Sequence, residues 1–451
     1  MEKPAEYSTE RAVVSKTMWR LIPLLFLCYI IAYVDRINVS FAGLQLQQAF
    51  GVDEDRYKAI YGLGAGVFFI GYFIFELPSN LILQRVGARL WIARIMVVWG
   101  LVSSAMMYVR TPAGFYVMRF LLGVAEAGFF PGVILYLTYW FRAKDRARTV
   151  ALFATAGTLA GCFNSPLAGK LLQLDGVRGL AGWQWLFLLE GLPAIAVGFV
   201  VLAVLPDRPR QVRWLSAAEK EWLQAELDRD RAQAALQPQL RLWDVLTSGR
   251  VWLLCSLYFL LNAGGYGIEM WLPQIIKIIK GASGLSGSQV GWLNAIPFLA
   301  ATVCMVLAGR HSDKTGERRW HVAAAAFAGA IGFAVSALSG NLFIALAALA
   351  VALAGVKSML GPFWALSTAL MSGTAAAGGI AWINSVGNLG GFAGPAVVGY
   401  IREATGSFTA ALLVLAAALL GLGFLALMLR VAGPDQPAQG REGAENSRAE
   451  G

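Results

Sequence analysis

The chain has 451 residues, of which 57% are hydrophobic and 14% are charged, and its mean hydropathy is +0.60. Ordinary soluble domains carry about 25% charged residues, and a helix that crosses a bilayer needs about 20 apolar ones. Because the apolar residues stand in long blocks, the sequence indicates a membrane protein and excludes an ordinary soluble one. The net charge of +10 must therefore be compatible with a location in a membrane.

Apolar blocks separated by polar or turn-rich breaks predict twelve transmembrane helices. In chain order, their approximate ranges are 19–41, 59–82, 91–109, 113–138, 149–172, 183–205, 250–275, 288–308, 320–338, 341–367, 378–401 and 408–430. Residues 1–18 are too polar for a cleaved signal, so we expect a cytoplasmic N-terminal segment there. Residues 431–451 are expected to form a disordered cytoplasmic tail.

The positive charge follows the predicted orientation. With both termini in the cytoplasm, 26 of the 37 Lys and Arg residues fall in inner loops and tails. This is the positive-inside bias of membrane proteins, so lipid is the expected surroundings and nucleic acid is excluded as a partner. The four Cys and two His residues show no metal-ligand spacing, and we expect neither a metal nor a cofactor.

The stretch YVDRINVSF, residues 33–41, places Asp35 and Arg36 at the end of the first span. The fourth span carries Arg119 and Glu126. A charge at the bilayer centre costs roughly 3 kcal/mol, so these residues need partners or a function. Helical rise puts Asp35 about 21 Å above the inner side and Arg119 about 9 Å below the outer side. In a hydrocarbon core about 30 Å thick these depths coincide, so we expect Asp35 and Arg119 to pair. An ion pair that only fixes helix register is the structural alternative.

The polar connector at 206–249 divides a six-helix bundle at 19–205 from another at 250–430. In it, Ser216 and Glu219 have the spacing of a capping box that starts a surface helix. An offset of 229 residues aligns Gly87 with Gly316 and Pro166 with Pro395, which indicates a duplicated unit. The same offset aligns Asp35, Arg36, Arg119 and Glu126 with Gly264, Gly265, Ala348 and Gly355, so the second half lacks these charges at the matching positions.

Glycine runs in the spans predict close helix packing. They are YGLGAG at 61–66, GTLAG at 157–161, GNLGG at 387–391 and GGFAG at 390–394. No strand pattern precedes YGLGAG, so we interpret it as packing and not as a nucleotide loop.

Several motifs in order resemble the major facilitator superfamily, and within it the anion:cation symporters of bacterial organic acids such as tartrate, sugar acids and phthalate. They are AYVDRINVSFA, FELPSNLILQRVGAR, RFLLGVAEAGFFPGVILYLTYWF, GWQWLFLLEGLPA and PFWALSTALMSGTAAAGGIAWINSVGNLGGFAGP. The resemblance implies an all-α membrane protein with twelve transmembrane helices in two pseudo-symmetric halves. The chain departs from the family pattern at Asn80 and Gln84, where family members usually have a Gly and an Asp.

The resemblance also implies site residues. Carboxylates at Asp35 and Glu126 would carry the coupling proton, and Arg36 and Arg119 would bind substrate. Further candidates for the substrate cavity are Tyr33, Tyr72, Trp364, Asn384 and Asn164, although Asn164 can equally bond across helices. Gating loops would contain Arg85, Gly87, Arg89, Gly309, Asp313, Lys314 and Gly316.

Lys357, in the tenth span, is expected to be the unpaired cation of the second half. Either it extends to the cytoplasmic interface, or it faces the cavity and grips a second carboxylate. Glu269 is expected to lie too near the outer surface to be its partner.

These expectations amount to a monomeric, proton-coupled importer of a small organic anion in the inner membrane, working by alternating access. The anion would be a dicarboxylate or hydroxy acid. An anion exchanger is the rival mechanism. A transporter-like sensor is disfavoured because the connector is short, and an enzyme because no nucleophile–base pair is visible.

Overall fold

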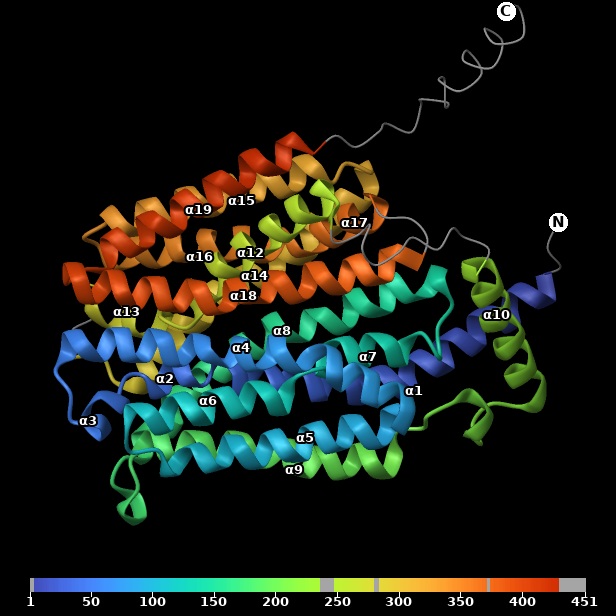
Figure 1. Ribbon diagram of the computed structural model, residues 1–451, viewed down its shortest axis with the longest axis horizontal. Helices are drawn as coiled ribbons and strands as arrows, with labels where there is room; N and C mark the ends of the chain where they lie inside the picture. Colours follow the sequence, from blue (N-terminus) through green and yellow to red (C-terminus); the bar gives the residue numbers. More distant parts are fainter. Residues whose placement is uncertain (1–3, 236–246, 280–283, 371–373, 430–451) are drawn as a thin grey trace, which may run out of the picture.

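The computed structural model describes residues 4–235, 247–279, 284–370 and 374–429. These residues form long helices and no strand, and the helices gather into two bundles that lie side by side (Figure 1). The predicted fold class is confirmed. The C-terminal tail and part of the connector lie outside the described residues.

The first half consists of long helices and of short helices that follow breaks between them. It comprises α1 (Pro4–Ile37), α2 (Val39–Ala42), α3 (Leu46–Phe50), α4 (Glu54–Val86), α5 (Ala88–Ala105), α6 (Pro112–Glu126), α7 (Phe129–Leu137), α8 (Ala143–Leu171) and α9 (Gly182–Val204). The short 3₁₀ helices are Met106–Tyr108, Leu172–Leu174, Val177–Gly179 and, after α9, Pro209–Gln211. The connector adds α10 (Ala217–Ala235).

The second half repeats this order. It comprises α12 (Gly249–Glu269), α13 (Leu272–Ile278), α14 (Gly287–Thr315), α15 (Arg319–Leu338), α16 (Leu342–Ser358), α17 (Leu360–Leu370), α18 (Thr374–Thr405) and α19 (Phe408–Met428). Ten helical segments of the described chain are long and apolar enough to span a membrane. The helices α8 and α18, which have 29 and 32 residues, lie at the positions of the predicted fifth and eleventh spans.

The two halves meet chiefly along two helix pairs, α4 with α18 and α8 with α14. The α4–α18 contact needs glycine. A Cβ at Gly62 would lie 2.6 Å from the carbonyl oxygen of Pro395, and one at Gly66 would lie 2.6 Å from that of Phe392. The YGLGAG run is therefore packing surface, as predicted, because backbones approach closely only where side chains are absent.

Four spans are interrupted just after a charged residue. Arg36 lies in the last turn of α1, and Glu126 ends α6. Glu269 ends α12, and Lys357 is in the last turn of α16. A short helix (α2, α7, α13 or α17) follows each break. Breaks in membrane-spanning helices leave backbone groups free inside the protein, where they line cavities.

The break in the fourth span depends on Gly128. Its φ of +83° is a left-handed conformation, and a Cβ there would meet Ser79 Oγ at 2.4 Å. Only glycine fits both conditions, so Gly128 fixes the direction in which Glu126 ends its helix.

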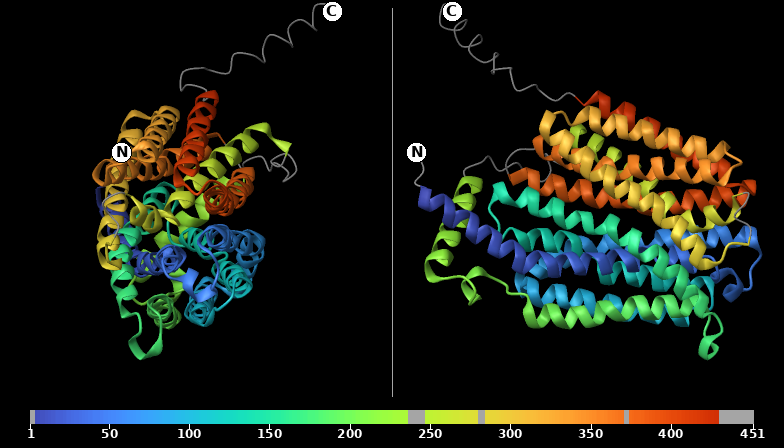
Figure 2. Two further views of the ribbon diagram at one scale, coloured as in Figure 1. Left: turned by 90° about the vertical axis from the view of Figure 1, so that its left-hand side faces the viewer. Right: turned by 180° about the vertical axis from the view of Figure 1, so that it is seen from behind.

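The connector helix α10 packs beside the start of α1 at one end of the molecule (Figure 2). The predicted capping box is confirmed: Ser216 N donates to Glu219 Oε2 at 2.8 Å, and Glu219 N donates to Ser216 Oγ at 3.2 Å. Lys16 Nζ lies 2.7 Å from Glu219 Oε1, and this hydrogen bond lowers the pKa of the Glu219 carboxyl. The connector is thus fastened to the first half.

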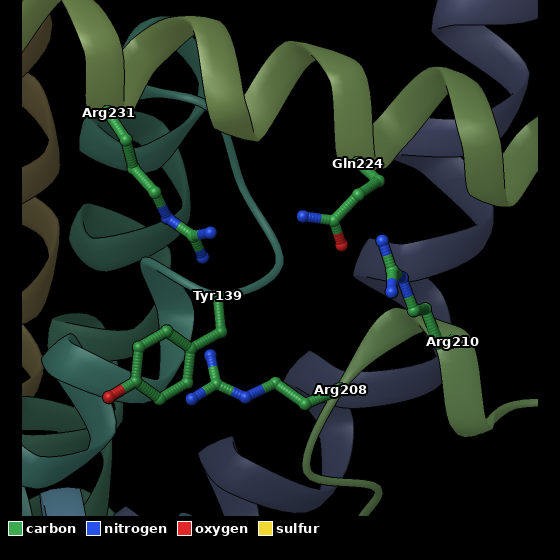
Figure 3. A pocket seen from close by; sticks show the side chains of 5 residues that line it. All are labelled: Tyr139, Arg208, Arg210, Gln224 and Arg231. Carbon is green, nitrogen blue, oxygen red and sulfur yellow. The ribbon is translucent and has the colours of Figure 1, made fainter.

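A surface pocket of about 530 Å³ lies between α10, the end of the fourth span and the segment after α9 (Figure 3). It is lined by Tyr139, Arg208, Arg210, Gln224 and Arg231. None of the predicted site residues lines it.

We predict that Gly66→Ala destabilises the protein because the new methyl group must push α18 away from α4, which costs about 1–3 kcal/mol. Gly421→Ala is the matched control, since no atom lies within 4 Å of a Cβ at that helical glycine. Both changes share the same gain in helix propensity. Thermal unfolding in detergent should show a lower Tm for Gly66→Ala alone. Equal Tm values would contradict the close α4–α18 contact.

Candidate functional site

Asp35 and Arg36 are neighbours in sequence, but their side chains have different partners. Asp35 accepts hydrogen bonds from Trp99 Nε1 and Ser103 Oγ, both at 2.7 Å and both on α5. Asn38 Nδ2 lies 3.4 Å from Asp35 Oδ1. The buried Asp35 carboxylate is therefore held by neutral donors inside the first half and forms no ion pair with any described residue.

Arg36 is directed towards the middle of the molecule. Its Nη2 forms an ion pair with Glu126, and its Nη1 donates to the hydroxyl of Tyr266 at 2.9 Å. The guanidinium carbon lies 5.6 Å from the ring centroid of Tyr72. Since Tyr266 is on α12, the first-half ion pair is hydrogen-bonded across to the second half. Tyr72, one of the candidates for the substrate cavity, therefore lies beside Arg36.

The predicted pairing of Asp35 with Arg119 is wrong. Arg119 Nη2 donates to the backbone oxygen of Ala65 at 3.1 Å, and its Nε lies 3.4 Å from that of Gly64. Helical rise gives the depth of a residue but not the side of the helix on which it lies. Arg119 lies on the side of α6 that packs against α4, and Gly64 has no side chain to cover the carbonyls there.

Lys357 has an ion-pair partner, and its side chain is buried in the protein and does not extend to the cytoplasmic interface. Its Nζ lies 2.5 Å from Glu269 Oε1 and donates to the hydroxyl of Tyr33 at 2.8 Å. The same tyrosine hydroxyl donates to Glu269 Oε2 at 2.6 Å. All three side chains are buried.

The expectation that Glu269 is a poor partner for Lys357 is therefore wrong. The seventh span continues beyond Glu269 through α13, so the outer end of the span lies further along the chain than Glu269. A Cβ at Gly265 would lie 3.1 Å from Val356, so these two positions are level. Glu269 is one helical turn from Gly265, and a lysine side chain reaches across one turn.

The two ion pairs are pseudo-symmetric with the charges exchanged. The first half has its cation on the first span and its acid on the fourth, whereas the second half has its acid on the seventh and its cation on the tenth. Each first member has a tyrosine three residues earlier: Tyr33 before Arg36, and Tyr266 before Glu269. Each tyrosine bonds to the charged residue of the opposite half.

Residues from both halves also meet at Glu76 of α4. Its buried carboxylate accepts hydrogen bonds from Asn384 Nδ2 at 2.6 Å and from Ser385 Oγ at 2.9 Å, both on α18. The sequence predicted Asn384 as a site residue but missed Glu76 and Ser385. The signal for Glu76 was the same as for Asp35, a carboxylate within an apolar span.

The remaining candidates are distributed around this centre. Trp364 stacks edge-on against Tyr258, with ring centroids 5.0 Å apart. Asn164 is buried, and neither its amide nitrogen nor its amide oxygen has a hydrogen-bond partner among the described residues. Glu190, which the sequence did not single out, is buried beside Asn38 and interacts electrostatically with Asp35.

The predicted gating loops lie at the helix ends remote from these charges. Gly87 separates α4 from α5 with a φ of +101°, and Arg89 N donates to Asp207 Oδ1 at 2.9 Å. In the second copy, Asp313 Oδ1 accepts from Arg318 Nη1 at 2.7 Å, and Gly316 ends α14 with a φ of +69°. Three further residues of these loops lie on the helix surfaces: Arg85, Gly309 and Lys314.

Comparison with known proteins identifies the family of the chain. The model of the Major Facilitator Superfamily matches residues 25–284 and 274–449. A putative tartrate transporter of Agrobacterium vitis is 46% identical over 428 residues, which are 94% of this chain and 93% of that protein. The putative metabolite transport protein NicT of Pseudomonas putida is 43% identical over 422 residues, covering 93% of this chain and 94% of NicT.

Among solved structures, the xylose transporter XylE from E. coli has a similar fold, with a TM-score of 0.73 at 14% sequence identity, covering 94% of this chain and 100% of that chain. The two interrupted bundles, the family model and the relatives agree with the resemblance seen in the motifs. The chain therefore belongs to the Major Facilitator Superfamily and is a multi-pass membrane protein.

Proposed function

We propose that the protein imports a small organic anion, a hydroxy acid or dicarboxylate, together with protons across the inner membrane, with both termini in the cytoplasm. One observation carries this proposal. The buried cation Arg36 is held by a titratable carboxylate, Glu126, and by a tyrosine of the opposite half. A carboxylate substrate is the ligand that competes directly for such a cation. Relatives described as putative tartrate transporters support the substrate class.

The ion pair supplies a coupling mechanism. A guanidinium binds a planar carboxylate through two parallel hydrogen bonds, so a substrate carboxylate displaces Glu126 from Arg36. A buried carboxylate without a cation is costly, and Glu126 takes up a proton instead. Substrate and proton then bind together. Because Arg36 also contacts Tyr266, the same exchange loosens a contact between the halves, as alternating access requires.

Other residues have supporting roles in this proposal. Among the described residues, the hydrogen-bond donors to Asp35 are all neutral, so Asp35 accepts a second proton without losing an ion pair. Arg119, fixed to the backbone of α4, adds positive potential near Glu126. The proposed substrate contacts are Arg36, Tyr33, Tyr72, Asn164, Lys357, Trp364 and Asn384. The loops with Gly87 and Gly316 would hinge the inner side.

We predict that Glu126→Gln lowers the accumulation driven by a pH gradient but preserves counterflow, because the amide cannot carry the proton of Glu126 while Arg36 remains free to bind substrate. Proteoliposomes with an imposed pH gradient and labelled tartrate measure both activities. Glu221→Gln, a change to an exposed carboxylate of α10, is the matched control and should accumulate normally. Accumulation by Glu126→Gln equal to that of the parent protein would contradict proton coupling at this residue.

We predict different outcomes for the two buried arginines. Arg36→Lys keeps the charge but loses the planar fork, so tartrate affinity should fall at least tenfold, about 1.4 kcal/mol. Arg119→Lys should mainly lower Tm, since Arg119 fastens α6 to α4 through backbone carbonyls. Equilibrium binding and thermal unfolding of both variants separate the effects. Near-native affinity in Arg36→Lys would show that charge alone matters.

A further inference from the structure

The second-half ion pair has the properties of a second anion site. Lys357 and Glu269 are buried and lie at the ends of interrupted helices, as Arg36 and Glu126 do. The cation of each pair also lies against one shared ring. Arg36 Cζ is 5.9 Å and Lys357 Nζ is 5.3 Å from the centroid of Tyr33. Two cations this close to one tyrosine lie within reach of one small molecule.

We propose that Lys357 and Glu269 form a second carboxylate site, so that the substrate is a dicarboxylate gripped at both ends and each second carboxylate brings one additional proton. This inference rests on the proposed function, because it concerns the substrate and protons of the same site. It assigns Glu269 as a proton acceptor in addition to Asp35 and Glu126.

The additional proton follows from the charges. A substrate carboxylate that binds the Lys357 ammonium displaces Glu269, and the displaced carboxylate is left buried. Leaving such a charge unpaired costs several kcal/mol, so a proton from solution forms an O–H bond with Glu269. No covalent bond of the substrate forms or breaks. The substrate brings one negative charge and the proton one positive charge, so the net charge of the site is unchanged.

Few groups compete for that proton. Within the described residues, the titratable groups facing Glu269 are Lys357 from α16 and Tyr33 from α1, with Tyr266 one turn earlier on its own helix. Tyr33 now donates to Glu269 and accepts from Lys357. Once Glu269 is protonated, the Tyr33 hydroxyl is free to donate to the substrate carboxylate that replaces it. Tyr33 therefore helps to exchange one carboxylate for the other.

The structure also explains why the two sites would act together. Tyr33 and Arg36 are three residues apart on α1, and Tyr266 and Glu269 are three residues apart on α12. A dicarboxylate that displaces both acids breaks the Tyr33–Glu269 contact and re-pairs Arg36, the partner of Tyr266. A monocarboxylate bound at Arg36 leaves the Lys357–Glu269 pair and its Tyr33 contact in place.

The test measures protons per substrate from reversal potentials of the purified full-length protein in proteoliposomes. The probes are L-tartrate and L-threonate, which differ by the replacement of one carboxylate by a hydroxymethyl group. We expect tartrate to move one more proton than threonate. Glu269→Gln should remove that difference, because Lys357 then accepts the second carboxylate without a proton. Equal proton numbers for the two acids in the parent protein, or a difference that persists in Glu269→Gln, would overturn the inference and leave the proposed function standing.

A second variant covers the case in which Glu269→Gln does not fold. The double change Lys357→Met with Glu269→Gln removes both charges and leaves none unpaired. It should lower kcat/KM for tartrate relative to threonate by at least tenfold, whereas an unchanged ratio would overturn the second carboxylate site. Failure of the parent protein to transport any carboxylate with protons would instead overturn the proposed function, and this inference with it.

Discussion

The cost of burying charge in the middle of a membrane protein governs this structure. Arg36, Glu126, Glu269 and Lys357 are all buried, and each isolated charge would be unstable in the low-dielectric core. They occur as two ion pairs, and within each pair the positive and negative charges cancel. Stability of the core therefore depends on each charge keeping a partner, and any process that removes one partner must supply a substitute.

The fold makes that substitution possible. Each of the four charges lies at or next to the end of a helix, where the backbone is interrupted. Three of them, Arg36, Glu269 and Lys357, bond to a tyrosine of the opposite half. The tyrosines on α1 and α12 then connect each pair to the other bundle. A ligand carboxylate or a proton that changes the pairing therefore also changes contacts between the halves. In the proposed mechanism, substrate binding, proton binding and movement of the bundles depend on the same few hydrogen bonds.

The architecture could be predicted from the sequence because it depends on local and repetitive signals. Long apolar blocks specify spans, glycine spacing specifies close helix contacts, and an offset of 229 residues reveals the duplication. The buried charges were also found, since an ionisable residue within an apolar block stands out.

The partners of these charges could not be predicted in the same way. Arg119 and Asp35 lie at similar calculated depths but on differently facing helix sides, and Lys357 reaches one helical turn to Glu269. A fixed offset also missed the relation between the ion pairs, because Glu269 lies one turn beyond the position that matches Arg36 and carries the opposite charge. Pairing depends on helix rotation and side-chain reach, which a single sequence does not contain.

A structure of the protein with tartrate bound would decide whether the substrate takes the place of both acids. We expect the two substrate carboxylates to lie within hydrogen-bond distance of Arg36 and Lys357, with Glu126 and Glu269 displaced from these cations. A ligand bound elsewhere, with both ion pairs and both tyrosine contacts intact, would contradict this expectation.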